Sequence, residues 1–173
     1  LGLLDSIARR RQASAVPELT RLLSDPDEPT VAAAARALGE ISDTAAVAAL
    51  QARTEPSPAP IAAAKLSAAS RLPATTALPL LSELQRAARD PVHRVAAFRL
   101  SLDLEPAMAT DRIVDVLAGT NWDIKAVAVE AIAAARAPNL VSTLAVRLAD
   151  LDAPTQRAVT AALERRPDGA GAQ

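Results

Sequence analysis

The sequence predicts an all-α fold of about five stacked helix pairs, and three observations lead to this prediction. About a quarter of the 173 residues are alanine, and only 1% are aromatic. Apolar residues recur at helical spacing and nowhere alternate as in a half-buried strand. A block of sequence recurs roughly every 31 residues. Because alanine favours helix but contributes little apolar area, such helices must pack closely to form a core.

The repeat is clearest where residues 15–41 are aligned with residues 46–72. A shift of 31 places Val16 on Val47 and Leu38 on Ala69. One apolar position of the first helix then recurs at Leu19, Leu50, Leu84, Ile113 and Leu144. A second position, here termed the reference position of the second helix, recurs at Thr30, Ile61, Val95, Ile124 and Thr155. Both series step by 31, 34, 29 and 31 residues, so the separation within each pair stays at 11.

Each element follows from this register. The first helices carry apolar residues at helical spacing, as at Leu19, Leu22 and Leu23. Turns with Asp, Asn, Gly or Pro follow most first helices, at residues 25–29, 90–91, 119–121 and 150–154. Asp and Asn can cap the next helix, whereas proline cannot continue the previous one. The Ala-rich second helices are predicted over residues 30–38, 61–69, 95–103, 124–132 and 155–163. Asp103 stands where Leu is expected, which predicts a shifted or irregular end of the third one.

The two ends of the chain differ from this pattern. We expect a partial repeat or capping helix over residues 1–14, the repeat array over 15–166 and a flexible C-terminal tail over 167–173. Leu3, Leu4 and Ile7 lie 31 residues before Ala34, Ala35 and Leu38, so they hold the apolar positions of a second helix. With no partner on their outer side, these residues are predicted to fray or to self-associate.

The first residue also bears on location. The chain begins at Leu1 rather than Met, so we expect upstream sequence. No apolar run approaches the roughly 20 residues that span a bilayer. Membrane attachment is therefore expected only through such an upstream segment, and the location is predicted to be cytoplasmic.

Charge and composition exclude several kinds of site. The 19 basic residues balance 20 acidic ones, for a net charge of −1, and they form no basic stripe with stacking aromatics. Nucleic acid is therefore not an expected partner. With no cysteine, thiolate metal sites, disulfides and cysteine nucleophiles are excluded, and one histidine is too few for a histidine-based metal site. We find no catalytic constellation and expect no cofactor, no metal and no enzymatic activity.

A few residues could still carry chemistry, and each has a simpler interpretation. His93 is predicted to be an ordinary turn residue before a helix. The acids Asp25, Asp27 and Glu28 lack the spacing of a calcium loop and are expected to cap a helix. Trp122 is predicted to pack beneath a hairpin. The basic run 9–11 is interpreted as a solvated helix end, with a membrane or nucleic-acid contact as the alternative.

Residues 119–135, GTNWDIKAVAVEAIAAA, resemble a bacterial HEAT-like repeat of the phycobilisome-lyase type, whose pattern is roughly D-P-x-W-x-V-R-x-A-A-x-x-A-L-G. The matching positions are Asn121, Trp122, Ile124, Lys125, Ala128, Ala131 and Ile132, and in the first full repeat Asp25, Pro26, Ala34, Ala37, Leu38 and Gly39. The resemblance covers about residues 15–166. The basic residue of the pattern is kept only as Lys125. This resemblance implies a HEAT-like α-solenoid, an α-α superhelix whose second helices line a concave binding face.

On such a face the residues six and ten after the reference position are expected to be exposed. Together with the basic residue of the pattern, they give the candidate partner contacts Arg36, Glu40, Arg71, Glu105, Lys125 and Glu130. Their mixed charges suit a protein partner better than a phosphate backbone. The leading hypothesis is therefore a non-enzymatic protein-interaction scaffold, part of a larger bacterial protein. The alternatives are an accessory subunit resembling the bilin lyases, which work with a tetrapyrrole, and a nucleic-acid-binding solenoid.

Overall fold

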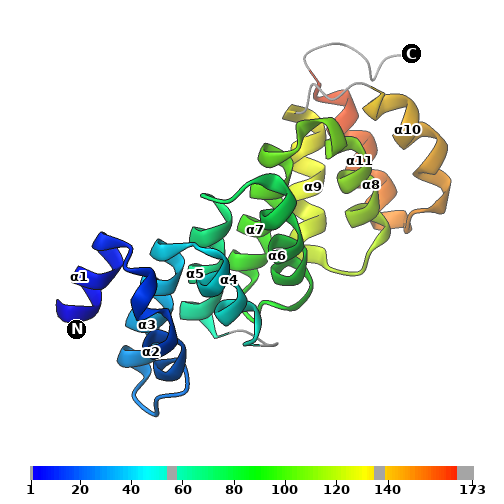
Figure 1. Cartoon of the computed structure of the whole chain (residues 1–173). Coiled ribbons are helices and arrows are strands. Elements are labelled where there is room, and N and C mark those ends of the chain that lie inside the picture. Colours follow the sequence, from blue (N-terminus) through cyan, green and yellow to red (C-terminus); the bar gives the residue numbers. More distant parts are fainter. Residues whose placement is uncertain (1, 54–57, 135–138, 167–173) are drawn as a thin grey trace. The chain divides into compact units, whose positions relative to one another are not determined.

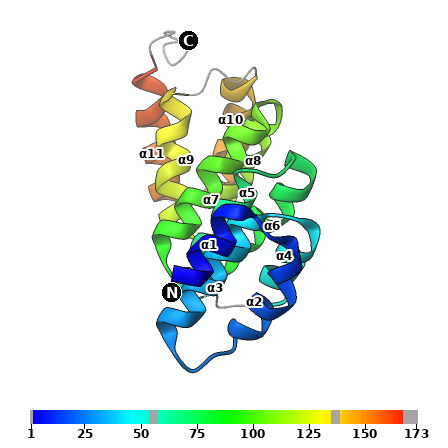
Figure 2. The same ribbon diagram turned by 60° about the vertical axis from the view of Figure 1, so that its left-hand side comes forward.

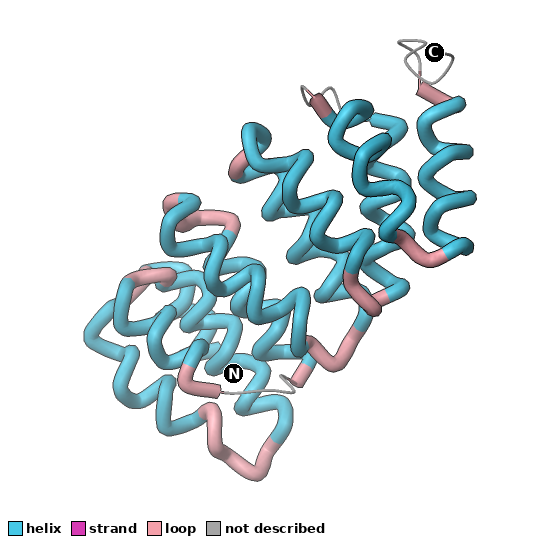
Figure 3. The backbone as a smooth tube through the Cα atoms, turned by 90° about the vertical axis from the view of Figure 1, so that its right-hand side faces the viewer, coloured by secondary structure: helices cyan, strands magenta, loops and turns pink. Residues whose placement is uncertain are grey.

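Paired helices make up the backbone in the computed structural model, which describes residues 2–53, 58–134 and 139–166. Figure 3 shows only helices, loops and turns over these ranges, with no strand among them. The all-α fold class predicted from composition and repeat, with helices arranged in successive pairs, is thus confirmed. By contact the chain divides into two compact units, residues 1–101 and 102–173.

The first unit begins with α1 (Gly2–Arg10), which packs against α3 (Figures 1 and 2). Three helix pairs follow along the chain. They are α2 (Val16–Leu22) with α3 (Glu28–Ile41), α4 (Thr44–Gln51) with α5 (Ala59–Ala69), and α6 (Ala74–Ala87) with α7 (Pro91–Leu104), and a short 3₁₀ turn, η1 (Ala13–Ala15), precedes α2. Ile7 of α1 is half-buried, whereas the side chains of Leu3 and Leu4 lie outside the described residues. Fraying or self-association at this end stays a prediction.

The second unit carries the remaining pairs. They are α8 (Ala109–Ala118) with α9 (Trp122–Ala134), and α10 (Leu140–Arg147) with α11 (Ala153–Glu164), with the 3₁₀ turns η2 (Pro106–Met108) and η3 (Leu148–Asp150) before α8 and after α10. Within this unit α9 packs against both α8 and α11. The second helix of one pair thus packs on that of the next, as the repeat predicts. The expected tail, residues 167–173, lies outside the described residues.

The core contains the apolar series that defines the repeat. Leu19, Leu50, Leu84, Ile113 and Leu144 are all at most 1% exposed. Fully burying each such side chain contributes roughly 1.5–3 kcal/mol relative to leaving it in water. The register read from the first helices is therefore confirmed.

Aspartates start several helices, as the turns at residues 25–29 and 150–154 predicted. The Asp27 carboxylate accepts a hydrogen bond from the Thr30 amide at 3.0 Å, at the start of α3. Asp43 caps α4 through the Ala46 amide at 2.7 Å, and Asp152 caps α11 through the Thr155 amide at 2.8 Å. These bonds satisfy amides that have no partner inside the helix.

The boundary between the two units lies beside the irregular position that the sequence singled out. Eight residues after the reference position, Leu38, Ala69 and Ile132 are completely buried. Asp103 takes this position in the third repeat and is exposed, although α7 continues without a break to Leu104. The division between the units, after Ser101, thus falls two residues before this exposed acid.

Candidate partner-binding groove

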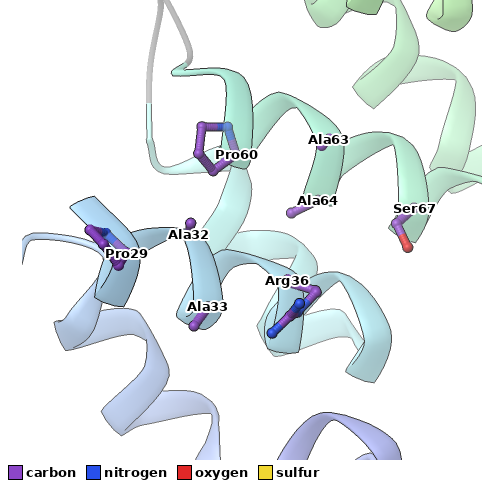
Figure 4. A pocket seen from close by; sticks show the side chains of 8 residues that line it. All are labelled: Pro29, Ala32, Ala33, Arg36, Pro60, Ala63, Ala64 and Ser67. Carbon is purple, nitrogen blue, oxygen red and sulfur yellow. The ribbon is translucent and has the colours of Figure 1, made fainter. Parts of the chain in front are cut away.

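An open groove of about 430 Å³ runs between α3 and α5 in the first unit (Figure 4). The residues that line it are Pro29, Ala32, Ala33 and Arg36 of α3, and Pro60, Ala63, Ala64 and Ser67 of α5. The prolines lie at one end, and Arg36 and Ser67 lie at the other. We refer to this feature as the α3–α5 groove.

The two walls of the groove come from the same positions of two successive repeats. In each wall the lining residues lie one residue before the reference position and two, three and six residues after it. Equivalent residues of the two walls are therefore 31 residues apart in the sequence. Small side chains at these positions leave space between the helices. In the third repeat the plus-three position holds Phe98, which is 1% exposed and fills the core instead. The groove therefore follows from the alanines at positions 33 and 64.

The two helices that form the groove approach each other closely at Gly39. A Cβ atom added to Gly39 would lie 2.8 Å from the carbonyl oxygen of Ala64. Real Cβ atoms do not come this close to backbone, so only glycine fits at this position without a shift of α5. The missing side chain brings the backbones together at the Arg36 end.

The rim at this end is held by a network around Arg71. Its guanidinium donates to the Gly39 carbonyl at 3.0 Å and to both Glu40 carboxylate oxygens at 3.3 Å. It also bonds the Ser67 hydroxyl at 2.7 Å. The cation thus bonds the Gly39 carbonyl near the negative C-terminal end of α3, one repeat earlier. Two of the residues expected to meet a partner, Arg71 and Glu40, bond to each other.

The remaining predicted contact residues are spread over both units. Arg36 is exposed and lines the groove. Glu130 is exposed on α9, and the half-buried Glu105 is bonded to Arg112 at 2.5 Å, both within the second unit. The structure brings together Arg36, Glu40 and Arg71 at one end of α3 and α5.

Lys125 was expected at the partner-binding face, and the structure corrects this expectation. The residue is only 4% exposed, because its ammonium is held within the second unit. It donates to the Asp152 carboxylate at 2.7 Å and to the Thr155 hydroxyl at 3.2 Å. It also lies 4.9 Å from the centre of the Trp122 ring, within the range of a cation–π contact. Lys125 therefore joins α9 to α11.

The ion pair has an electrostatic consequence. The bond from Lys125, followed by those from the backbone and hydroxyl of Thr155, lowers the pKa of Asp152 from its ordinary 3.8 to about 2. The charged form of Asp152 is thus held at the start of α11, where the helix dipole also favours an anion.

Trp122 was expected to pack beneath a hairpin, and this expectation was wrong. The side chain is 57% exposed at the first residue of α9. Lys125, one turn later on the same helix, covers part of the ring. His93 also differs slightly from the prediction, since it lies in the first turn of α7 rather than before the helix, with Nδ1 3.8 Å from Asp90.

Sequence reasoning missed a buried cation in the first unit. Lys65 of α5 is completely buried, and its ammonium bonds the Glu83 carboxylate at 2.6 Å and the Arg53 carbonyl at 3.1 Å. The register contained the signal, because Lys65 lies four residues after the reference position. The same position holds the completely buried Ala34 and Ala128 in other repeats.

Further arginines were also missed as links between repeats. Arg53 donates to the Leu23 carbonyl at 2.6 Å, and Arg166 donates to the Ile132 carbonyl at 2.9 Å. Each of these bonds joins a helix end to the equivalent helix of the preceding repeat, as Arg71 does. Nothing in their local sequence distinguishes these arginines from solvated ones.

Other kinds of site have no support within the part of the chain that the structure describes. No group of three or more His, Asp or Glu side chains there could hold a metal ion. Among the described helices, none combines the length and the apolar character needed to cross a bilayer.

Comparison with known proteins gives one match. No curated protein and no solved structure matches the chain. The match is to HEAT repeats in general and does not single out the phycobilisome-lyase type. It covers residues 2–70, so it runs from α1 to the end of α5 and includes every residue that lines the groove. The N-terminal part of the first unit thus matches the family model of HEAT repeats.

Proposed function

We propose that this chain is a non-enzymatic protein-binding module and that its partner docks in the α3–α5 groove. The observation that carries the proposal is the groove itself, in which two successive second helices present small apolar side chains beside an exposed arginine. HEAT repeats are generally protein-interaction scaffolds, and the match to them covers this groove.

The chemistry of the groove supports a protein partner. Its walls are proline and alanine over most of their length, so they offer apolar surface and few polar groups. A partner that places apolar side chains between α3 and α5 would cover this surface and gain from its removal from water. Arg36 and Ser67 at one end would fix the orientation of that partner through polar contacts.

The proposal is tested by a matched pair of substitutions. Ala63 and Ala126 occupy the same position, two residues after the reference position, and both are exposed. Ala63 lines the groove, whereas Ala126 belongs to α9 of the second unit. Ala63→Glu places a charge in the groove, and Ala126→Glu places the same charge on an equivalent helix elsewhere.

Proteins captured by the wild-type chain from an extract of its source cells are purified, and their affinity for each variant is measured by calorimetry. We expect Ala63→Glu to weaken binding by about tenfold or more, which corresponds to about 1.4 kcal/mol. Ala126→Glu should leave the affinity unchanged. Equal affinities for the two variants, with both shown to be folded by circular dichroism, would contradict the proposal.

A further inference from the structure

The charged residues around the α3–α5 groove are distributed unevenly between its two ends. Asp27 and Glu28 lie at the N-terminal end of α3, next to Pro29.

The opposite end of the groove carries Arg36 and Arg71. The exposed arginines 9–11 lie at the end of α1, the helix that packs on α3. The acids at that end are Glu40, which pairs with Arg71, and Asp43, which caps α4. Among the side chains that the structure describes at that end, arginines therefore outnumber carboxylates.

The repeat explains why these charges gather. Arg9, Glu40 and Arg71 are spaced by 31 residues and hold equivalent repeat positions, near the ends of α1 and α3 and just after α5. The close approach of α3 and α5 near Gly39 brings Glu40 and Arg71 into contact. Cations at a helix C-terminus also complement the helix dipole. The Arg36 end of the groove is thus an electropositive edge next to an apolar surface.

We infer that the groove accepts an amphipathic helix of a partner protein, with apolar side chains along the groove and carboxylates against its Arg36 end. This inference rests on the proposed function and adds the chemistry of the partner. Each wall spans eight residues, which corresponds to roughly 12 Å, or about two helical turns. Two parallel helices separated by alanine rows offer a groove into which the side-chain ridge of a third helix packs.

A nucleic-acid strand would fit this surface poorly. The walls between the ends consist of Ala and Pro, which offer no partner for successive phosphates. Single strands also bind by stacking on aromatic rings, and the chain contains only Phe98 and Trp122. Phe98 is buried, and Trp122 belongs to the second unit. The combination of an apolar groove and a basic end therefore favours an acidic, apolar protein segment.

The inference is tested with synthetic helical peptides and the full chain. The probe is a fluorescein-labelled amphipathic helix with leucines along one face and glutamates in one terminal turn. A companion peptide carries lysine at each glutamate position, and a third carries serine at each leucine position. Fluorescence anisotropy measures the affinity of each peptide, and a single-stranded oligonucleotide serves as an unlabelled competitor.

We expect the glutamate peptide to bind about tenfold more tightly than the lysine peptide, and salt to reduce this difference. The serine peptide should not bind. Arg36→Glu should abolish or reverse the preference for glutamate, Ala63→Glu should weaken both peptides, and Ala126→Glu should change neither. Circular dichroism checks that the variants remain folded.

Several outcomes would overturn the inference. The glutamate and lysine peptides could bind equally, neither could bind, or Arg36→Glu could leave the preference intact. The oligonucleotide could also displace the labelled peptide as strongly as unlabelled glutamate peptide does. This result would contradict the inference, because the basic end would then bind any polyanion. The peptides could fail to bind while Ala63→Glu still weakens binding of the natural partner. In that case the proposed function stands and only the inferred chemistry of the partner is wrong.

Discussion

Arg71, two residues after the end of α5, donates to the carbonyl of Gly39 at 3.0 Å, across a step of 32 residues. The same guanidinium contacts the carboxylate of Glu40 at 3.3 Å. These bonds join the C-terminal ends of two successive second helices, where carbonyls lack partners within the helix. Arg53 and Arg166 make comparable bonds to Leu23 and Ile132. Arginine therefore links neighbouring repeats at several of their ends.

Removing this link should cost measurable stability. Arg71→Ala should lower the free energy of unfolding by about 1 kcal/mol, the usual net value of a hydrogen bond, since the partly exposed ion pair adds little. Arg86→Ala, which removes an exposed arginine of α6, should stay within about 0.5 kcal/mol of wild type. Chemical denaturation measures both. Equal effects would mean that the link has no structural role.

Gly39 should not tolerate a side chain. Gly39→Ala gains up to about 1 kcal/mol of helix propensity, but its Cβ would meet the Ala64 carbonyl oxygen at 2.8 Å. Moving α5 away typically costs about 1–3 kcal/mol, so we expect a net loss of stability. Gly2→Ala is the control, because nothing lies within 4 Å of a Cβ there. A thermal melt in which Gly39→Ala is more stable than wild type would contradict the close approach of α3 and α5.

Two core substitutions test the repeat register in each unit separately. Leu84 and Ile113 are completely buried, so truncation to alanine should destabilise the protein by about 2–5 kcal/mol at each site. Val146→Ala, at a residue that is 77% exposed, should have an effect within about 0.5 kcal/mol. Urea denaturation provides the comparison. A loss well under about 1 kcal/mol at both buried sites would show that the register is wrong.

The ion pair between Lys125 and Asp152 should make stability depend on pH. The pKa of Asp152 is about 2 in the folded protein and about 3.8 in the unfolded chain, so folding favours the ionised form. Its contribution is fully present above pH 3.8 and disappears as the pH falls through 2. Asp152→Asn retains a good helix cap but loses the charge. We expect this variant to be less stable than wild type at neutral pH and equally stable below about pH 2. Urea denaturation across this pH range gives the difference, and a constant gap at every pH would contradict the pairing.

The fold was predictable because its determinants are local or periodic. Alanine content, the constant separation of 11 residues within each pair and aspartates before helices all report on the nearest repeat. The buried environment of Lys65 could also have been read from the register, since the equivalent Ala34 is completely buried. Helix pairing and the apolar core therefore follow from the sequence alone.

Features that depend on residues far apart in the chain were not predictable. Lys125 resembles a surface lysine until α11 brings Asp152 to its ammonium, 27 residues later. The exposure of Trp122 depends on where α9 begins. One local feature was missed as well, because the turn after α1 places Arg11 in the left-handed region, at a φ of 47°, where glycine is the expected residue. Of the residues predicted to contact a partner, Arg36 is exposed on α3, whereas Lys125 is buried.

The central claim is that a protein partner occupies the α3–α5 groove, and site-specific photocrosslinking in cells tests it most directly. A small diazirine amino acid is placed at Ala63 in one variant and at the equivalent, exposed Ala126 in another. The account predicts a discrete crosslinked protein from position 63 that is absent from position 126 and is lost when Arg36→Glu is added. Crosslinks of equal yield from both positions, or from position 126 alone, would contradict it.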